Sequence, residues 1–143
     1  RPTSFFYNAP HCSADTCSQE ILALGTPFIW WSATIGLGVL IGYVVSRRDK
    51  RGALILLGVA AGYLPWFAFQ QRTVFSFYSI VFEPFIILVL TYLIGLLQQR
   101  YKSLIYGFFI AVALCFLYFL PIYIAQTITY GEWHARMWFS SWI

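Results

Sequence analysis

Four long apolar stretches limit what this chain can fold into. They cover approximately 27–46, 53–69, 74–97 and 103–125, and a helix needs about 20 residues to cross a bilayer. The runs are continuous rather than alternating, which favours helix over strand, and a helix satisfies its own backbone hydrogen bonds in lipid. Because the connections are short, neighbouring helices must run in opposite directions. The sequence predicts an all-α integral membrane protein with four antiparallel transmembrane helices.

The composition excludes the soluble alternatives. Of the 143 residues, 60% are hydrophobic and 10% are charged, whereas soluble domains carry about 25% charged residues. So few charges cannot cover a soluble surface, which excludes a soluble enzyme, a disordered chain and a nucleic-acid-binding domain. The chain starts at Arg1 without a methionine, so we expect a piece of a longer protein or a processed product.

The basic residues predict the orientation in the membrane. The turns at 46–52 and 98–102 carry six of them, against three on the other side. The six are Arg47, Arg48, Lys50, Arg51, Arg100 and Lys102, and the three are Arg1, Arg72 and Arg136. The positive-inside rule places the six in the cytoplasm. We therefore expect a multi-pass protein of the cell membrane in which residues 1–26, 126–143 and both termini are extracytoplasmic and flank a membrane region at 27–125.

Two cysteines precede the first apolar stretch. Cys12 and Cys17 are five positions apart on the predicted outer side, where a disulfide can form and persist. A redox-active pair is the weaker interpretation, because the spacing is not Cys-x-x-Cys and no cation is adjacent. A metal site with His11 lacks a fourth ligand. Cys115, within the fourth stretch, is predicted to pack against its neighbours.

Two charged residues flank or interrupt the third stretch. Arg72 lies at the predicted outer interface among aromatic residues, and a guanidinium grips phosphate oxygens bidentately. It suits a lipid phosphate, and equally a snorkelling arginine at the membrane edge. Glu83 precedes Pro84, and a carboxylate at such depth usually faces a bundle interior or a wet cavity. The two would lie about 16 Å apart along one helix, too far for an ion pair.

The C-terminal segment combines aromatic and polar side chains. Trp133, Trp138 and Trp142 are typical of an interfacial aromatic belt. The alternative is a polar site for a sugar or phosphate, to which Glu132, His134 and Arg136 would contribute. The residues alone favour the belt interpretation.

Glycines recur inside the apolar stretches. Gly38 and Gly42, like Gly58 and Gly62, have the small-xxx-small spacing that lets helices approach closely. The sequence therefore predicts close helix packing at both pairs.

An ordered series of motifs resembles one family over essentially the whole chain. The motifs are RPTSFFY at 1–7, Gly25-Thr26-Pro27 before Trp30-Trp31, GYLPW at 62–66, RTVFSFY at 72–78, Pro84-Phe85, and WHARMWFSSW at 133–142. Together they resemble the C-terminal four-helix membrane region of bacterial protein O-mannosyltransferases.

The resemblance implies a polytopic glycosyltransferase of the GT-C type. Such enzymes transfer mannose from a polyprenyl or dolichyl phosphate to Ser or Thr hydroxyls of secreted proteins, with inversion, and some members use a divalent metal. The acidic residue that acts as the catalytic base is expected in an N-terminal half that this chain lacks, so no catalytic or metal-binding residue is predicted here and the chain alone is expected to be inactive. Arg72 becomes the candidate ligand of the donor phosphate. The candidate outer-site polar residues are Glu83, Glu132, His134 and Arg136.

The expected partners are the N-terminal half, the donor lipid, secreted proteins and membrane lipids, without nucleic acid. Two other functions stay open. One is a non-catalytic membrane scaffold subunit, and the other is a small thiol oxidoreductase using Cys12 and Cys17. A transporter is disfavoured, because the apolar stretches contain one carboxylate and no pair of broken helices.

Overall fold

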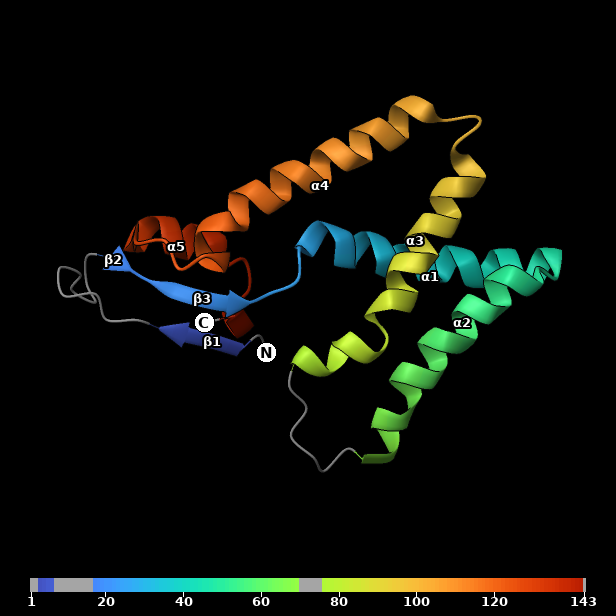
Figure 1. Cartoon of the computed structure of the whole chain (residues 1–143), viewed down its shortest axis with the longest axis horizontal. Coiled ribbons are helices and arrows are strands. Elements are labelled where there is room, and N and C mark those ends of the chain that lie inside the picture. Colours follow the sequence, from blue (N-terminus) through green and yellow to red (C-terminus); the bar gives the residue numbers. More distant parts are fainter. Residues whose placement is uncertain (1–2, 7–16, 70–75, 143) are drawn as a thin grey trace.

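The computed structural model describes residues 3–6, 17–69 and 76–142 (Figure 1). The α-helices are α1 (Pro27–Arg47), α2 (Lys50–Tyr63), α3 (Glu83–Leu97), α4 (Lys102–Tyr123) and α5 (Tyr130–Arg136). Three short 3-10 helices are η1 (Leu64–Phe69), η2 (Ser76–Val81) and η3 (Ser140–Trp142). The strands are β1 (Thr3–Phe6), β2 (Cys17–Ser18), β3 (Glu20–Ala23) and β4 (Ile128–Thr129).

Three helical segments of the described chain are long and apolar enough to cross a membrane. They are Pro27–Arg47, Lys50–Ala68 and Lys102–Tyr123, which confirms the first, second and fourth predicted stretches as helices of that kind. The second is composite: α2 ends at Tyr63 and η1 continues it through Pro65, whose ring disfavours a regular α-helix there.

The third stretch differs from the prediction of one helix over 74–97. The described part consists of η2, a break at Phe82, and α3, which begins at Glu83 and has only 15 residues. Pro84 lies in the first turn of α3, where its missing N–H costs nothing and its fixed φ favours a helix start. At about 1.5 Å per residue α3 is roughly 22 Å long, short of the about 30 Å hydrocarbon core. The single-helix prediction is therefore wrong, and Glu83 lies in a first turn rather than mid-helix.

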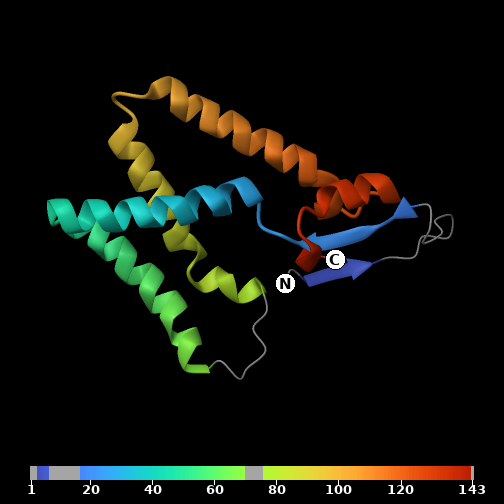
Figure 2. The same ribbon diagram turned by 180° about the vertical axis from the view of Figure 1, so that it is seen from behind.

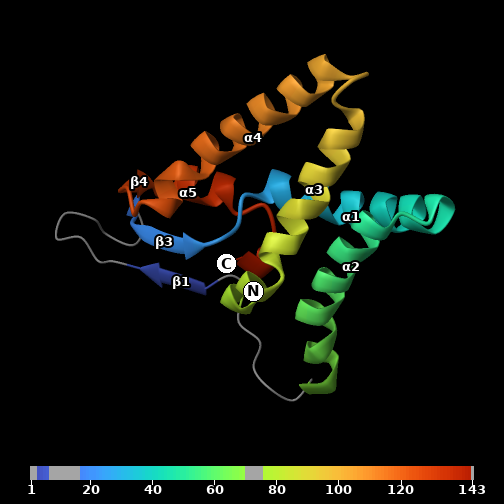
Figure 3. The same ribbon diagram turned by 45° about the vertical axis from the view of Figure 1, so that its right-hand side comes forward.

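The helices do not form an aligned four-helix bundle. α1, α2 and α3 pack together around Ala33, Leu40, Val59, Ile86 and Val89. α4 leaves the end of α3 and diverges from that group, as Figures 1 and 2 show from opposite sides. α4 approaches the three-helix group again near the start of α1, where the Phe28 ring lies 5.6 Å from that of Phe108 (Figure 3).

The two predicted glycine pairs have different surroundings. A methyl group at Gly62 would lie 2.8 Å from Cβ of Phe82, and one at Gly58 would collide with the ring of Phe85. The close packing predicted for this pair is confirmed, because α2 approaches α3 on its glycine face. At Gly38 and Gly42 a methyl group would meet nothing within 4 Å among the described residues, so the prediction is wrong there.

The two ends of the chain form one folded unit, here called the cap (residues 3–6, 17–26 and 126–142). β1 and β3 pair antiparallel with Phe6 opposite Glu20, and β2 pairs antiparallel with β4, with Cys17 opposite Thr129. These strands are absent from the all-α prediction. The cap packs on the end of α4, and their shared core consists of Leu22, Ile128, Trp133 and Met137 of the cap with Phe119 and Ile122 of α4. Segments predicted only to lie on one side of the membrane are thus packed against each other.

Candidate functional site

Short helix α5 places three of the predicted polar residues on the cap. Thr129 begins it with a capping box: its hydroxyl oxygen accepts from the Glu132 N–H at 3.3 Å, and the Glu132 carboxylate accepts from the N–H and hydroxyl of Thr129, both at 3.0 Å. The Thr129 N–H, then its hydroxyl, with a contribution from the Arg136 charge, hold the pKa of Glu132 below its usual range. The Glu132 carboxylate therefore stabilises the helix start as an anion.

Arg136 fastens α5 to the end of α4. Its Nε donates to the carbonyl oxygen of Tyr118 at 2.8 Å, and its Nη1 donates to that of Glu132 at 2.6 Å. The guanidinium carbon lies 5.0 Å from the centroid of the Tyr118 ring, and the Tyr118 hydroxyl donates to the Ala135 carbonyl oxygen. Within the described part of the chain, Nη2 of Arg136 makes no hydrogen bond.

His134 is exposed on α5. Its ring centroid lies 6.4 Å from that of Tyr130, and its carbonyl oxygen accepts from the Met137 N–H. Among the described residues no group of three or more His, Cys, Asp and Glu side chains could hold a metal ion.

A buried carboxylate that the sequence analysis missed joins the two halves of the cap. Glu20 of β3 is 3% exposed and accepts a hydrogen bond from the indole N–H of Trp133, and a second from Ser4 of β1. Burial raises the pKa of Glu20. Its sequence signal was weak: Glu20 and Leu22 alternate with exposed residues in a four-residue strand. This contact connects residues 113 positions apart.

An apolar groove runs between α1, α4 and the C-terminal segment. It has a volume of about 310 Å³ and is lined by Phe28, Trp31, Leu114, Cys115, Tyr118 and Trp138. The Trp31 and Trp138 rings lie 5.7 Å apart, and Trp142 packs against Phe119.

Trp133 is only 5% exposed. The belt interpretation is therefore wrong for Trp133, whose hydrogen bond and burial hold the cap together.

The other predicted residues are spread over the molecule. Arg72 and Cys12 lie outside the described residues. The two sides of 70–75 are close to each other, since the rings of Trp66 and Tyr78 lie 4.9 Å apart. Glu83 is half-buried in α3, and its side chain makes no hydrogen bond or ion pair within the described ranges, so nothing there joins it to α5.

The cysteines divide into two kinds. Cys17 is disulfide-bonded, while Cys115 carries a free, half-buried thiol that lines the groove between α1 and α4. The bonded state of Cys17 is the one that the sequence predicted for it, and Cys115 packs as expected.

Comparison with known proteins gives one group of relatives. No protein-family model matches the chain, and no solved structure matches it. The chain is 31% identical over 145 residues to the polyprenol-phosphate-mannose--protein mannosyltransferase of Mycolicibacterium smegmatis. It is 29% identical over 141 residues to that of Mycobacterium tuberculosis, and 30% identical over 155 residues to that of Corynebacterium glutamicum.

These matches are partial on the side of the relatives. They cover 94%, 92% and 99% of this chain, respectively, but 28%, 27% and 30% of the three relatives. The chain thus spans less than a third of the length of the relatives that it matches. Over nearly all of its own length, it is similar to part of a polyprenol-phosphate-mannose--protein mannosyltransferase.

Proposed function

We propose that this chain is the donor-binding membrane part of a protein mannosyltransferase of the GT-C type, with the cap on the outer face. The observation that carries the proposal is the match over nearly the whole chain to three relatives whose names state both donor and acceptor. The catalytic base and the rest of the active site are assigned to the part of such enzymes that this chain does not span.

The donor combines an apolar polyprenyl chain with a charged phosphate, so its site needs an apolar groove with a cation beside it. The groove between α1 and α4 suits a stretch of polyprenyl chain, because aromatic and aliphatic side chains line it. Tyr118 lines this groove and also packs against the Arg136 guanidinium, so a cation stands at its edge. These features support donor binding next to the cap.

Arg72 is proposed as the main phosphate ligand. A guanidinium can hold two phosphate oxygens at once and stays charged at any physiological pH. In the reaction, the bond from the anomeric carbon to the phosphate oxygen breaks, and the leaving phosphate keeps the electron pair. A new bond forms to the acceptor hydroxyl, whose proton passes to a base. A cation on the phosphate stabilises the charge that develops as this bond breaks.

The residues of α5 receive positioning roles. The Glu132 carboxylate is bonded to Thr129, and the Arg136 guanidinium is bonded to the carbonyl oxygens of Tyr118 and Glu132. These internal contacts favour a scaffolding role for α5. In this proposal they hold the C-terminal segment against α4, next to the groove, while Arg72 contacts the donor.

The test substitutes Arg72 in the complete natural protein. Transfer of labelled mannose from polyprenyl-phosphate mannose to a Ser/Thr peptide is measured for Arg72→Ala and Arg72→Lys, with Arg100→Ala as a matched loss of charge at another turn. Loss of a desolvated, charge-assisted contact costs about 2–5 kcal/mol, or roughly 30-fold to several thousand-fold in rate. Arg72→Ala should lose that much, Arg72→Lys less, and Arg100→Ala almost nothing. Normal transfer by a correctly inserted Arg72→Ala protein contradicts the assignment.

A further inference from the structure

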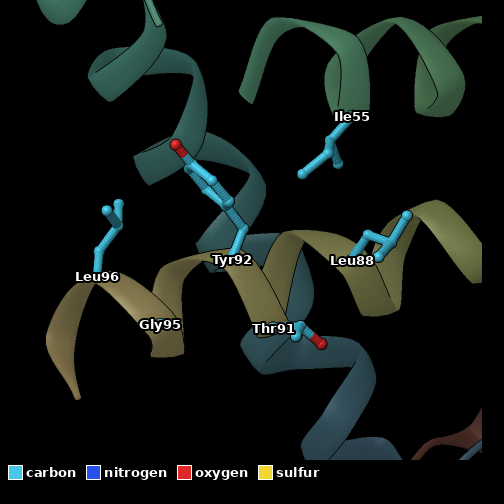
Figure 4. A pocket seen from close by; sticks show the side chains of 6 residues that line it. All are labelled: Ile55, Leu88, Thr91, Tyr92, Gly95 and Leu96. Atoms are coloured by element: carbon cyan, nitrogen blue, oxygen red, sulfur yellow. The ribbon is translucent and has the colours of Figure 1, made fainter. Parts of the chain in front are cut away.

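A second apolar groove lies between α2 and α3, far from the cap. Its volume is about 290 Å³, and its lining is Ile55 of α2 with Leu88, Thr91, Tyr92, Gly95 and Leu96 of α3 (Figure 4). Leu88 and Leu96 are each nearly half exposed, so the groove is open on its outer side. The Thr91 hydroxyl donates to the Ile87 carbonyl oxygen within the helix. The groove therefore presents almost purely apolar surface.

The turn between α1 and α2 carries a concentration of positive charge. Arg47, Arg48, Lys50 and Arg51 are all exposed, and within the described part of the chain none of their side chains forms an ion pair or hydrogen bond. The one acid among them, Asp49, accepts from the Gly52 N–H and the Tyr92 hydroxyl, both at 2.7 Å. The turn thus exposes four cations, and its one carboxylate already accepts two hydrogen bonds.

The groove and the basic turn are parts of one surface. Tyr92 lines the groove, and its hydroxyl ends on Asp49 in the turn. Arg51 precedes Ile55 by four residues, so both lie on the same face of α2, and Arg51 interacts electrostatically with Asp49 and with Tyr92. Figure 4 shows Ile55 directed from α2 toward α3, where Tyr92 and Leu88 stand beside it. The apolar groove therefore ends next to a cluster of exposed cations.

We propose that this surface binds an anionic phospholipid, with an acyl chain along the α2–α3 groove and the phosphate on the Arg48 and Arg51 side of the turn. Charge complementarity selects this occupant: a zwitterionic lipid leaves the cations uncompensated, and a second copy would bring like-charged turns together. The site lies at the Arg47 end of α1, whereas the donor site proposed above lies at the Pro27 end. It therefore goes beyond the proposed function and concerns the opposite membrane face.

The headgroup half of the proposal is tested by lipid retention. The full chain is purified in detergent with equal amounts of phosphatidylglycerol and phosphatidylcholine of the same acyl chains, and bound lipid is counted by native mass spectrometry. Each cation near an anionic headgroup contributes about 1 kcal/mol, or roughly fivefold. The double variant Arg48→Gln/Arg51→Gln should therefore lose roughly 30-fold in phosphatidylglycerol binding. The control Arg100→Gln/Lys102→Gln removes the same charge at the other turn and should keep its binding within a few-fold.

The acyl-chain half is tested by filling the groove. A Cβ added at Gly95 would meet nothing within 4 Å, and Gly95 lines the groove, so we expect Gly95→Leu to fill the groove without forcing the backbone apart. We expect a tenfold or greater loss of phosphatidylglycerol retention. Gly107→Leu on α4 is the matched control, because Gly107 is equally open and does not line the groove, and it should bind like the unsubstituted chain.

Three results would overturn the proposal. They are equal retention of the two lipids by the unsubstituted chain, equal losses in the two charge variants, and undiminished binding by Gly95→Leu. A stable dimer that forms in the same spectra only when lipid is stripped away, and that Gly95→Leu abolishes, would assign the groove to a second copy instead. No mannosyl donor enters these measurements, so their outcome is independent of the donor-binding proposal.

Discussion

Removing one N–H group should loosen the whole cap. Trp133→Phe keeps an aromatic ring in the core but deletes one of the two donors to the buried Glu20 carboxyl and leaves only that of Ser4. An unsatisfied buried polar group costs about 1–3 kcal/mol, and the space left by the smaller ring adds about 1 kcal/mol. The cap should lose roughly 2–4 kcal/mol, which raises the open population roughly 30- to 900-fold.

Hydrogen exchange followed by mass spectrometry measures this opening directly. The reporters are amides of β1 and β3, which pair from Thr3–Ala23 to Phe6–Glu20. The matched control is Trp138→Phe, the same truncation at a side chain that is 44% exposed, and it should change exchange by much less. Unchanged exchange in Trp133→Phe, or equal acceleration in both variants, would show that the Glu20–Trp133 contact does not hold the cap closed.

Two further predictions concern pH and helix packing. Burial raises the pKa of Glu20 above its ordinary value of 4.5, so its stabilising contribution is complete below pH 4.5 and is lost as the pH rises through the raised value. After correction for intrinsic exchange, β1 and β3 should open more readily at pH 7 than at pH 4, and Glu20→Gln should remove this dependence; a variant with the same pH profile would contradict it. Gly62→Val places a Cβ 2.8 Å from Phe82 and should cost about 1–3 kcal/mol by overpacking. Thermal unfolding tests this against Gly107→Val, and equal melting temperatures for the two would disprove the contact.

The membrane helices were largely predictable because their signal is local. Long apolar runs identified α1, α2 and α4 within a few residues of their ends. The third stretch was misread because apolar residues continue through the break, while the deciding residue is Pro84, a proline at a helix start. The glycine spacing gave the correct pair at 58 and 62 but could not tell which helix face meets a neighbour at 38 and 42.

The cap was beyond sequence reasoning for a different physical reason. Its strands are only two to four residues long, too short for a local period to reveal them, and β2 pairs with β4 across most of the chain. The sequence did single out Glu132 and Arg136, but as ligands of a sugar or phosphate. In the structure both side chains form hydrogen bonds with other residues of the chain. One available signal was overlooked: Thr129 and Glu132 have the spacing of a capping box. Glu20 became recognisable only once Trp133 lay beside it.

The way the cap is assembled sets an order on biogenesis. One half lies before Pro27 and the other after Tyr123, and the three described helical segments that are long and apolar enough to cross a membrane lie between them. A ribosome releases the first half long before the second exists, so the pairing of β2 with β4 and the packing of β3 against α4 must wait. Such distant pairing forms late, because the intervening chain must first be arranged. Closure of the cap therefore requires α4 to be in place, because α4 brings residues 126–142 against residues 3–6 and 17–26.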